Sequence, residues 1–200
     1  MLGAGILIPA FLQENPVIFP EKNCQKDIPV IICLGISAAV FANVLFFLLQ
    51  ITGSFESFSK VSSSQFSLPV WGGIVLYGLV SPLAEELVFR GVVYNRFRRQ
   101  YPFVIAFLAS AFLFGIFHGN LVQALYGFLL GLLILWLYEK YGAFLIPFLV
   151  HSSANIIIYV LMGTKSLQNV IMTIPFCMLS GLVTVALIVC ILRKRKENLH

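Results

Sequence analysis

The sequence predicts an all-α, polytopic membrane protein, with about six transmembrane helices preceded by an interfacial or re-entrant N-terminal segment. Three observations lead to this fold class. Of the 200 residues, 60% are hydrophobic and only 10% are charged, whereas soluble domains carry roughly a quarter charged residues. The apolar residues form runs close to the ~20 residues that cross the hydrocarbon core of a bilayer. Most basic residues lie in short segments between these runs. The apolar excess must therefore face lipid.

The apolar runs predict six spans within a single integral membrane domain, residues 1–200. These runs are residues 28–51, 68–95, 103–118, 121–138, 143–162 and 170–192. The third is short, and the second is interrupted by charged residues. Residues 1–19 are apolar but contain Pro9 and Pro16 together with Gln13 and Glu14, so we expect this segment to be interfacial or re-entrant. Residues 52–67 are polar and rich in serine, which predicts a surface loop.

The distribution of basic residues predicts the orientation of the chain in the membrane. With six spans, ten basic residues fall on one side: Lys22, Lys26, Arg96, Arg98, Arg99, Lys140, Arg193, Lys194, Arg195 and Lys196. The other side holds only Lys60 and Lys165. The positive-inside rule places the more basic side, with the C-terminus, in the cytoplasm. The net charge of +5 is thus explained by topology, and we expect the lipid bilayer but no nucleic acid as a partner.

Several ionisable residues lie inside the predicted spans, where each is costly in contact with lipid. They are Glu85, Glu86 and Arg90 in the second span, His118 at the end of the third, and His151, with Asn155, in the fifth. The simplest way to remove them all from lipid is to direct them into one shared interior cavity. We expect this cavity to open toward the cytoplasmic side.

Helical spacing assigns different neighbours to these groups. Glu86 and Arg90 are four residues apart and can form a salt bridge on one helix face, whereas Glu85 is rotated away toward other helices. A proton shared among Glu85 and the two histidines would couple their titrations and suit a carboxylate to general-base catalysis. His151 and Asn155 are also four residues apart and could donate hydrogen bonds to an oxyanion.

Other interpretations of the same residues remain open at this point. The Glu85, Glu86 and Arg90 cluster could be a buried salt bridge that only holds helices together. Glu85, His118 and His151 could supply a two-His, one-carboxylate zinc site, although the sequence lacks His-Glu-x-x-His. The same groups could relay protons in a transporter or act in a non-catalytic binding protein, but no inverted repeat is visible.

Three motifs, in this order on successive predicted spans, resemble the CAAX-protease and bacteriocin-processing (Abi) family of intramembrane proteases. They are Glu-Glu-x-x-x-Arg at 85–90, Phe-x-x-x-His at 114–118 and His-x-x-x-Asn at 151–155. The resemblance covers residues 68–162. The family includes the type II prenyl-protein endopeptidase, which has more spans, so its N-terminal helices would be reduced here to residues 1–19. No residue of this chain predicts specificity for a prenyl group.

The resemblance implies an endopeptidase of glutamic type that acts on a membrane-associated peptide or protein without a metal cofactor. It implies that Glu85 activates water together with His118, while His151 and Asn155 hold the oxyanion. Glu86 and Arg90 match the first motif in a supporting role, and Phe114 packs beside His118. We expect the protein to lie in a bacterial cell membrane, because the chain is compact and shows no eukaryotic retention or lipidation signal.

Overall fold

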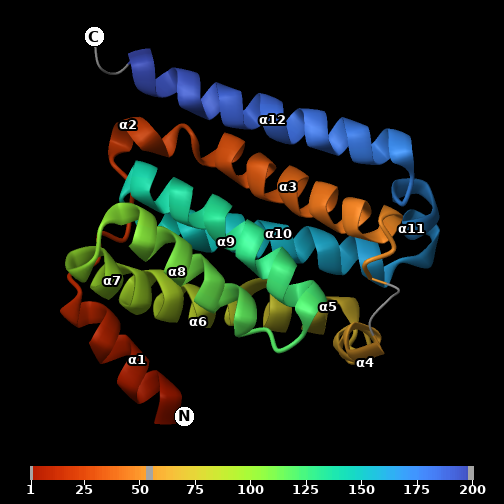
Figure 1. The fold of residues 1–200 in the computed structure, drawn as a ribbon, viewed down its shortest axis with the longest axis horizontal. Coiled ribbons are helices and arrows are strands. Elements are labelled where there is room, and N and C mark those ends of the chain that lie inside the picture. The colour runs from red at the N-terminus through yellow and green to blue at the C-terminus, as the bar shows by residue number, and fades with distance from the viewer. Residues whose placement is uncertain (1, 53–55, 198–200) are drawn as a thin grey trace.

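The structure is a computed structural model that describes residues 2–52 and 56–197, and within these ranges it contains helices and no strands (Figure 1). Helices long and apolar enough to cross a membrane are α3 (Ile28–Leu48), the continuous helix Val70–Gln100, α9 (Leu121–Tyr141), α10 (Leu145–Gly163) and most of α12 (Ile174–Glu197). They confirm the predicted all-α polytopic membrane fold. Each of the corresponding predicted spans overlaps its helix to within a few residues at either end.

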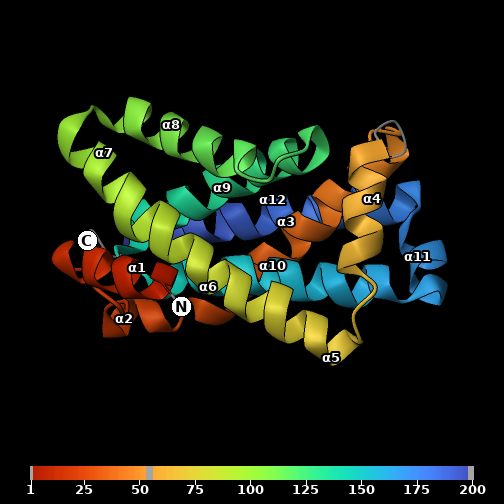
Figure 2. The same cartoon turned by 90° about the horizontal axis from the view of Figure 1, so that it is seen from below.

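The third predicted span is shorter than a full crossing. Helix α8 (Phe103–Ile116) has 14 residues and is therefore roughly 21 Å long, against a hydrocarbon thickness of ~30 Å. The chain reverses at Gly119, whose positive φ of 74° is readily adopted only by glycine. The side chain of Asn120 then accepts a hydrogen bond from the backbone of Gln123 and begins α9. Helices α8 and α9 consequently run antiparallel and pack along each other (Figure 2).

The second predicted span is a single 31-residue helix with an irregular backbone. It consists of α5 (Val70–Gly73), a π-helical stretch η1 (Ile74–Val80), α6 (Ser81–Glu86), a second π-helical stretch η2 (Leu87–Tyr94) and α7 (Asn95–Gln100). Pro82 has no backbone N–H to donate one turn back, so the regular α-helical ladder is interrupted near the end of η1. The six-residue segment α6, which carries Glu85 and Glu86, thus lies between two π-helical stretches, a feature frequent at functional sites.

Close packing brings this long helix against α10. A Cβ atom added to Gly73 would overlap the ring of Tyr159, so only glycine allows the tyrosine ring to lie there. The Tyr159 hydroxyl is within hydrogen-bond distance of the carbonyls of Gln65, at 3.2 Å, and Leu68, at 3.1 Å. This residue therefore joins α10 to the segment that precedes α5.

The prediction that residues 52–67 form a surface loop is wrong in its secondary structure, because most of this segment is helical. Residues 53–55 lie outside the described residues, but Glu56–Gln65 forms helix α4. This stretch contains neither proline nor glycine, so nothing in it prevents a helix, and its end is held by the Tyr159 contact with the Gln65 carbonyl. Helix α4 runs across the end of the bundle where α11 (Lys165–Ile171) also lies (Figure 2).

The N-terminal segment forms helix α1 (Leu2–Gln13), which packs on η2 rather than crossing the bundle (Figure 1). Phe11 is buried and contacts the ring of Phe144 at 4.8 Å between centroids. After α1 the chain continues to α2 (Lys22–Gln25) and on the way pairs with the start of α10. The backbone N–H groups of Phe144 and Leu145 donate to the carbonyls of Val17 and Ile18 at 2.8 and 2.9 Å.

Glu14, just beyond α1, anchors this segment to α7. Its carboxylate pairs with Arg96 at 3.0 Å and with Arg99 at 2.5 Å. Burial works to raise the pKa of Glu14, but the hydrogen bonds and positive charges of the two arginines outweigh it and hold the pKa below its ordinary value. The carboxylate is therefore charged, and the ion pairs are present, at neutral pH.

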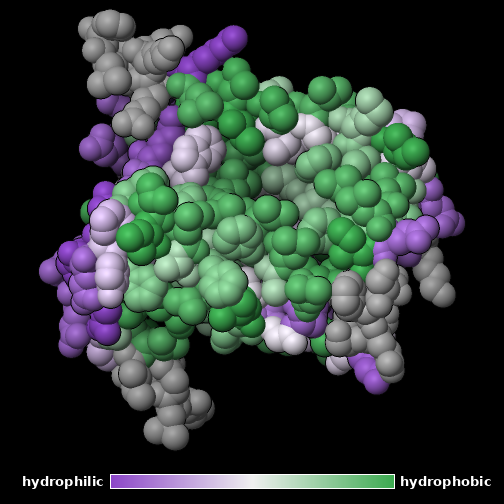
Figure 3. Space-filling model, viewed as in Figure 1, coloured by the Kyte–Doolittle hydropathy of each residue, from purple (hydrophilic) through white to green (hydrophobic). Residues whose placement is uncertain are grey.

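The hydrophobic core lies among α3, α9, α10 and α12. Its fully buried members include Ile31, Leu34, Ile134, Val150 and Ile191. Many large apolar side chains of α8 and α12 are instead exposed, as expected for surfaces that contact lipid. In the space-filling view, apolar side chains cover the middle of the visible face and hydrophilic ones gather mainly toward its ends (Figure 3). The protein is therefore a multi-pass integral membrane protein.

The two ends of the bundle differ in the segments that they carry. Helix α2, helix α7 and the C-terminal end of α12 lie at one end, whereas α4 and α11 lie at the other (Figure 1). We call the first the basic end, because these segments, with Lys26 just after α2 and Lys140 in the last turn of α9, hold the ten basic residues grouped together above. The second we call the α4 end.

Candidate active site

A fully buried ion pair lies at the base of the candidate site. The Arg90 guanidinium donates from Nη1 to Oε1 of Glu86 at 2.9 Å, which is the salt bridge predicted from helical spacing. Arg90 also donates from Nη2 to the carbonyl of Gly131 at 3.3 Å and lies 4.3 Å from the centre of the Phe114 ring. The pair thus connects α6 and η2 to α8 and α9.

The same carboxylate oxygen also holds His151, a contact that the sequence did not predict. Nδ1 of His151 lies 2.6 Å from Oε1 of Glu86, so this ring nitrogen carries the proton and donates it to the carboxylate. Nε2 of His151 then faces Glu85, with 3.8 Å between Nε2 and Oε2 of Glu85. Glu86 therefore fixes the orientation of the imidazole toward the second glutamate.

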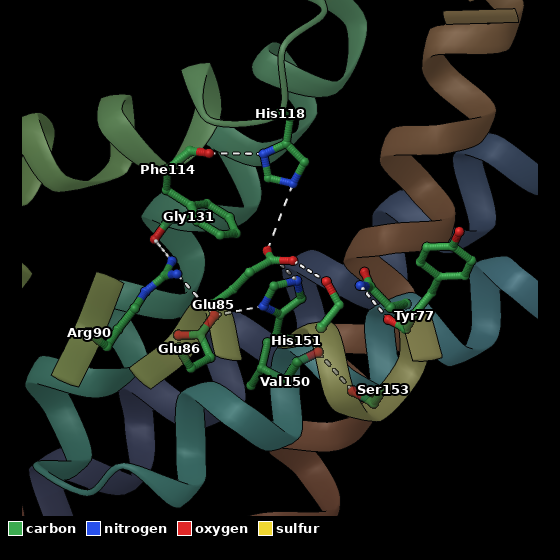
Figure 4. Close-up of polar contacts among 12 residues, drawn as sticks. Tyr77, Glu85, Glu86, Arg90, Phe114, His118, Gly131, Val150, His151 and Ser153 are labelled. Carbon is green, nitrogen blue, oxygen red and sulfur yellow. Dashed lines mark hydrogen bonds and ion pairs between the residues drawn. The ribbon is translucent and has the colours of Figure 1, made fainter. Parts of the chain in front are cut away.

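Glu85 has two oxygens in different environments. Oε1 accepts a hydrogen bond of 2.5 Å from the hydroxyl of Ser81, one turn earlier on the same helix. Oε2 is buried and has no hydrogen-bond partner among the described residues. It lies 3.9 Å from Nε2 of His118 and 3.8 Å from Nε2 of His151 (Figure 4). Two imidazoles thus face one carboxylate oxygen at distances too long for direct hydrogen bonds.

His118 is oriented by the backbone of its own helix. Its Nδ1 lies 2.9 Å from the carbonyl of Phe114, and because a carbonyl only accepts, the hydrogen-bond network assigns the proton to Nδ1. Nε2 consequently points at Glu85 (Figure 4). The Phe114 ring meets both His118 and His151 edge-on, with ring centres 5.2 and 5.5 Å apart. Phe114 packs beside His118 as predicted, and it also contacts His151.

The two residues expected to hold an oxyanion together, His151 and Asn155, lie on α10 in different environments. Asn155 lines the cavity described below, and its Nδ2 donates to the carbonyl of Tyr77 at 3.0 Å. His151 is almost fully buried, and its two ring nitrogens face the two glutamates. It is therefore Asn155 that can reach a group bound in the cavity, whereas the environment of His151 suits a contact with Glu85.

A cavity of about 940 Å³ adjoins these groups. Ser81, Glu85, His118 and Asn155 lie on its wall, and most of the remaining wall comes from α4, α9, α10, α11 and the C-terminal part of α3. The cavity therefore extends toward the α4 end, away from the basic end. The expectation that it opens on the side with the basic loops is wrong. No pattern in the sequence indicated that residues of α4 line the cavity, because this segment carries none of the three motifs.

The zinc alternative requires Glu85, His118 and His151 to form one ligand set. Among the residues that the structure describes, no three His, Cys, Asp or Glu side chains are grouped so that they could hold a metal ion. Nδ1 of each histidine is engaged, with Glu86 in one case and a backbone carbonyl in the other, whereas both Nε2 atoms face Glu85. The absence of a metal cofactor stays a prediction.

Comparison with known proteins identifies relatives of the region that carries these residues. The family model described as "Type II CAAX prenyl endopeptidase Rce1-like" matches residues 65–157. The "UPF0177 protein YxdF" of Lactococcus lactis subsp. lactis (strain IL1403) is 30% identical over 127 residues, which cover 63% of this chain and 70% of that protein.

A second relative, the "Putative membrane peptidase YdiL" of Bacillus subtilis (strain 168), is 27% identical over 96 residues. These residues cover 48% of this chain and 39% of the relative, so the similarity spans well under half of that protein. No solved structure matches the chain. The matched family region contains every member of the three motifs at 85–90, 114–118 and 151–155.

Proposed function

Because the chain belongs to the CAAX-protease and bacteriocin-processing family of membrane proteases, we propose that it hydrolyses a peptide bond with a water molecule activated by Glu85 and His118. The substrate is a membrane-associated peptide or protein. One observation carries this proposal. Oε2 of Glu85 is buried without a hydrogen-bond partner among the described residues, at the wall of a large cavity and within 4 Å of Nε2 of two histidines.

The spacing of these atoms suits a bound water. Polar atoms separated by more than about 3.5 Å are commonly bridged by water, and 3.9 Å separates Oε2 of Glu85 from Nε2 of His118. Such a water donates one hydrogen to the carboxylate and the other to Nε2, whose lone pair is free because Nδ1 carries the ring proton. Its oxygen lone pair then points into the cavity, toward the carbonyl carbon of a bound peptide.

Hydrolysis follows from this arrangement as a balanced set of proton transfers. Glu85 takes one proton from the water as its oxygen bonds to the carbonyl carbon, and the carbonyl oxygen becomes an oxyanion. Asn155 stabilises the oxyanion through the second N–H of its amide, because the first donates to Tyr77. The proton on Glu85 passes to the leaving nitrogen as the carbon–nitrogen bond breaks. The products are a carboxylic acid and an amine, and the site returns to its starting state.

The remaining residues position this machinery. Ser81 holds Oε1 of Glu85 and leaves Oε2 for the water. His151 lies between the two glutamates, with Nε2 facing Glu85 and Nδ1 facing Glu86.

The decisive experiment compares Glu85→Gln with the wild-type protein, using an internally quenched peptide in detergent. Glutamine keeps the shape of the side chain but cannot accept a proton from water, so turnover should fall by about 10²–10⁴-fold. The exposed Glu21, far from the motifs along the chain, supplies the matched control Glu21→Gln, which should cleave at the wild-type rate. A Glu85→Gln protein with unchanged turnover would refute the mechanism.

A strong chelator tests the zinc alternative in the same assay. We expect activity to survive chelation. Loss of activity that added zinc restores would support a metalloprotease instead. Absence of cleavage by the folded wild-type protein across a varied peptide set would favour a transporter or a non-catalytic binding protein.

A further inference from the structure

The position of the cavity indicates from which face of the membrane a substrate enters. Three segments on its wall belong to the α4 end of the bundle: Lys60, Ser64 and Gln65 from α4, Thr52 just before it, and Gln168 and Asn169 from α11. Figure 1 shows α4 and α11 at the end opposite α2, α7 and the C-terminal end of α12. The cavity thus extends from Glu85 toward the end that carries few basic residues.

The path from the basic end to the same carboxylate is closed by packing. Glu86, Arg90 and Phe114 are fully buried next to Glu85, on the side away from the cavity. One turn further toward the basic end, Tyr94 is also buried, and its hydroxyl donates to Glu139 at 2.6 Å. A polypeptide segment could not reach Glu85 from this end without separating α8, α9 and η2.

The side chains that line the cavity define the chemistry of its ligand. Lys60 and Glu85 are the formally charged ones among the described residues on its wall. Six carry amides: Asn43, Gln65, Gln123, Asn155, Gln168 and Asn169. An amide both donates and accepts hydrogen bonds, so it complements the N–H and C=O groups of an extended backbone. Burying a charged side chain among amides and apolar groups would instead be costly.

From these observations we propose that the substrate is an extended, uncharged polypeptide segment that enters from the α4 end, and that this end is the outer face of the cell membrane. The assignment of the outer face follows from the ten basic residues at the opposite end, which the positive-inside rule keeps in the cytoplasm. The proposal rests on the proposed function, because it concerns the substrate of the same site.

Sealed vesicles test the direction of entry. The full chain is expressed with its four cysteines replaced and with a single new cysteine, either Ser63→Cys in α4 or Gln100→Cys at the end of α7. Both positions are exposed, and neither lines the cavity. Right-side-out and inverted membrane vesicles are prepared from the same cells. Each preparation is labelled with a membrane-impermeant maleimide and assayed with an uncharged quenched peptide added outside, and vesicles containing Glu85→Gln provide the background rate.

We expect right-side-out vesicles to label Ser63→Cys and to cleave the external peptide, while inverted vesicles label Gln100→Cys and cleave only after detergent is added. Cleavage by intact vesicles that expose Gln100→Cys, or by both preparations, would overturn entry from the α4 end. Labelling of Ser63→Cys only in inverted vesicles would overturn the outer-face assignment. Absence of cleavage even in detergent would instead refute the proposed function, so the two failures are distinguishable.

Peptides of equal length test the substrate class in the right-side-out vesicles. One carries only uncharged residues around the scissile bond, and the others carry aspartate or lysine on either side of it. We expect kcat/KM to be at least about tenfold lower for the charged peptides, equivalent to 1.4 kcal/mol of transition-state stabilisation. Equal cleavage of all the peptides would overturn the inference that the cavity selects uncharged segments.

Discussion

Replacing Glu86 with alanine should lower the free energy of unfolding, and the contacts of the Glu86 carboxylate set the size of the effect. One oxygen of Glu86 accepts from Arg90 at 2.9 Å and from His151 at 2.6 Å, with the Arg90 and Glu86 side chains 1% and 0% exposed. Breaking a buried pair by removing one partner costs ~3–5 kcal/mol. Arg90 would still donate to the Gly131 carbonyl and contact the face of the Phe114 ring. We therefore expect the free energy of unfolding to fall by about 3 kcal/mol, the lower end of this range. In a chain of this size that lowers Tm by roughly 6–12 °C.

Thermal unfolding of purified related variants separates the contribution of the ion pair to stability from other effects of the substitution. Arg90→Met should cost less than Glu86→Ala, because Glu86 retains His151 and methionine preserves much of the buried volume. The double variant Glu86→Leu with Arg90→Met should recover most of the loss, since apolar replacements of a buried pair are often neutral or better. Glu85→Ala, at the adjacent position, should change stability by less than about 1 kcal/mol. A Glu86→Ala protein that melts like the wild type, or a double variant that loses the sum of both single effects, would refute this reasoning.

Three further predictions follow from individual contacts. Ser81→Ala should lower kcat roughly tenfold with little change in KM, because it releases the oxygen that orients Glu85; a higher KM with unchanged kcat would make Ser81 a substrate contact instead. Gly73→Ala should lower the melting temperature by the equivalent of ~1–3 kcal/mol, whereas the neighbouring Gly72→Ala, whose new Cβ meets nothing within 4 Å, should not. The ion pairs of Glu14 should contribute about 0.5–1 kcal/mol at neutral pH. The pKa of Glu14 in the folded state is lowered. This contribution is therefore fully present above the ordinary pKa of glutamate and is lost as the pH falls through the folded-state pKa. Glu14→Gln should abolish that part of the pH dependence of thermal unfolding, and an unchanged pH profile would contradict the assignment.

The sequence predicted those features that follow from the cost of placing polar groups in lipid. Glu86 and Arg90 had to be buried together, and their spacing of four residues was enough to pair them. The lengths of the apolar runs located the helices, because a bilayer demands a narrow range of lengths. These inferences need only the composition of a segment and the periodicity of one helix.

Features that depend on how helices cross were not predictable from the sequence. The contact between Glu86 and His151 requires α10 to pass α6 at one particular height, which no pattern within either helix specifies. The π-helical stretches on both sides of α6 alter the angular positions that regular α-helical spacing would give. The direction of the cavity depends on α4, which lacks an apolar run. Pro82 is a local signal of an irregular backbone.

The short helix α8 has a consequence for the surrounding bilayer. Its roughly 21 Å leave a hydrophobic mismatch of about 9 Å with an average membrane, and Leu108, Phe112 and Ile116 along it are exposed. The lipid beside α8 must become thinner to match so short a helix, because tilting would shorten its span further. This thinning acts on the end of α8 that immediately precedes His118. The acyl-chain length of the host lipid is therefore coupled mechanically to the distance between His118 and Glu85, and thick bilayers would pull these two groups apart.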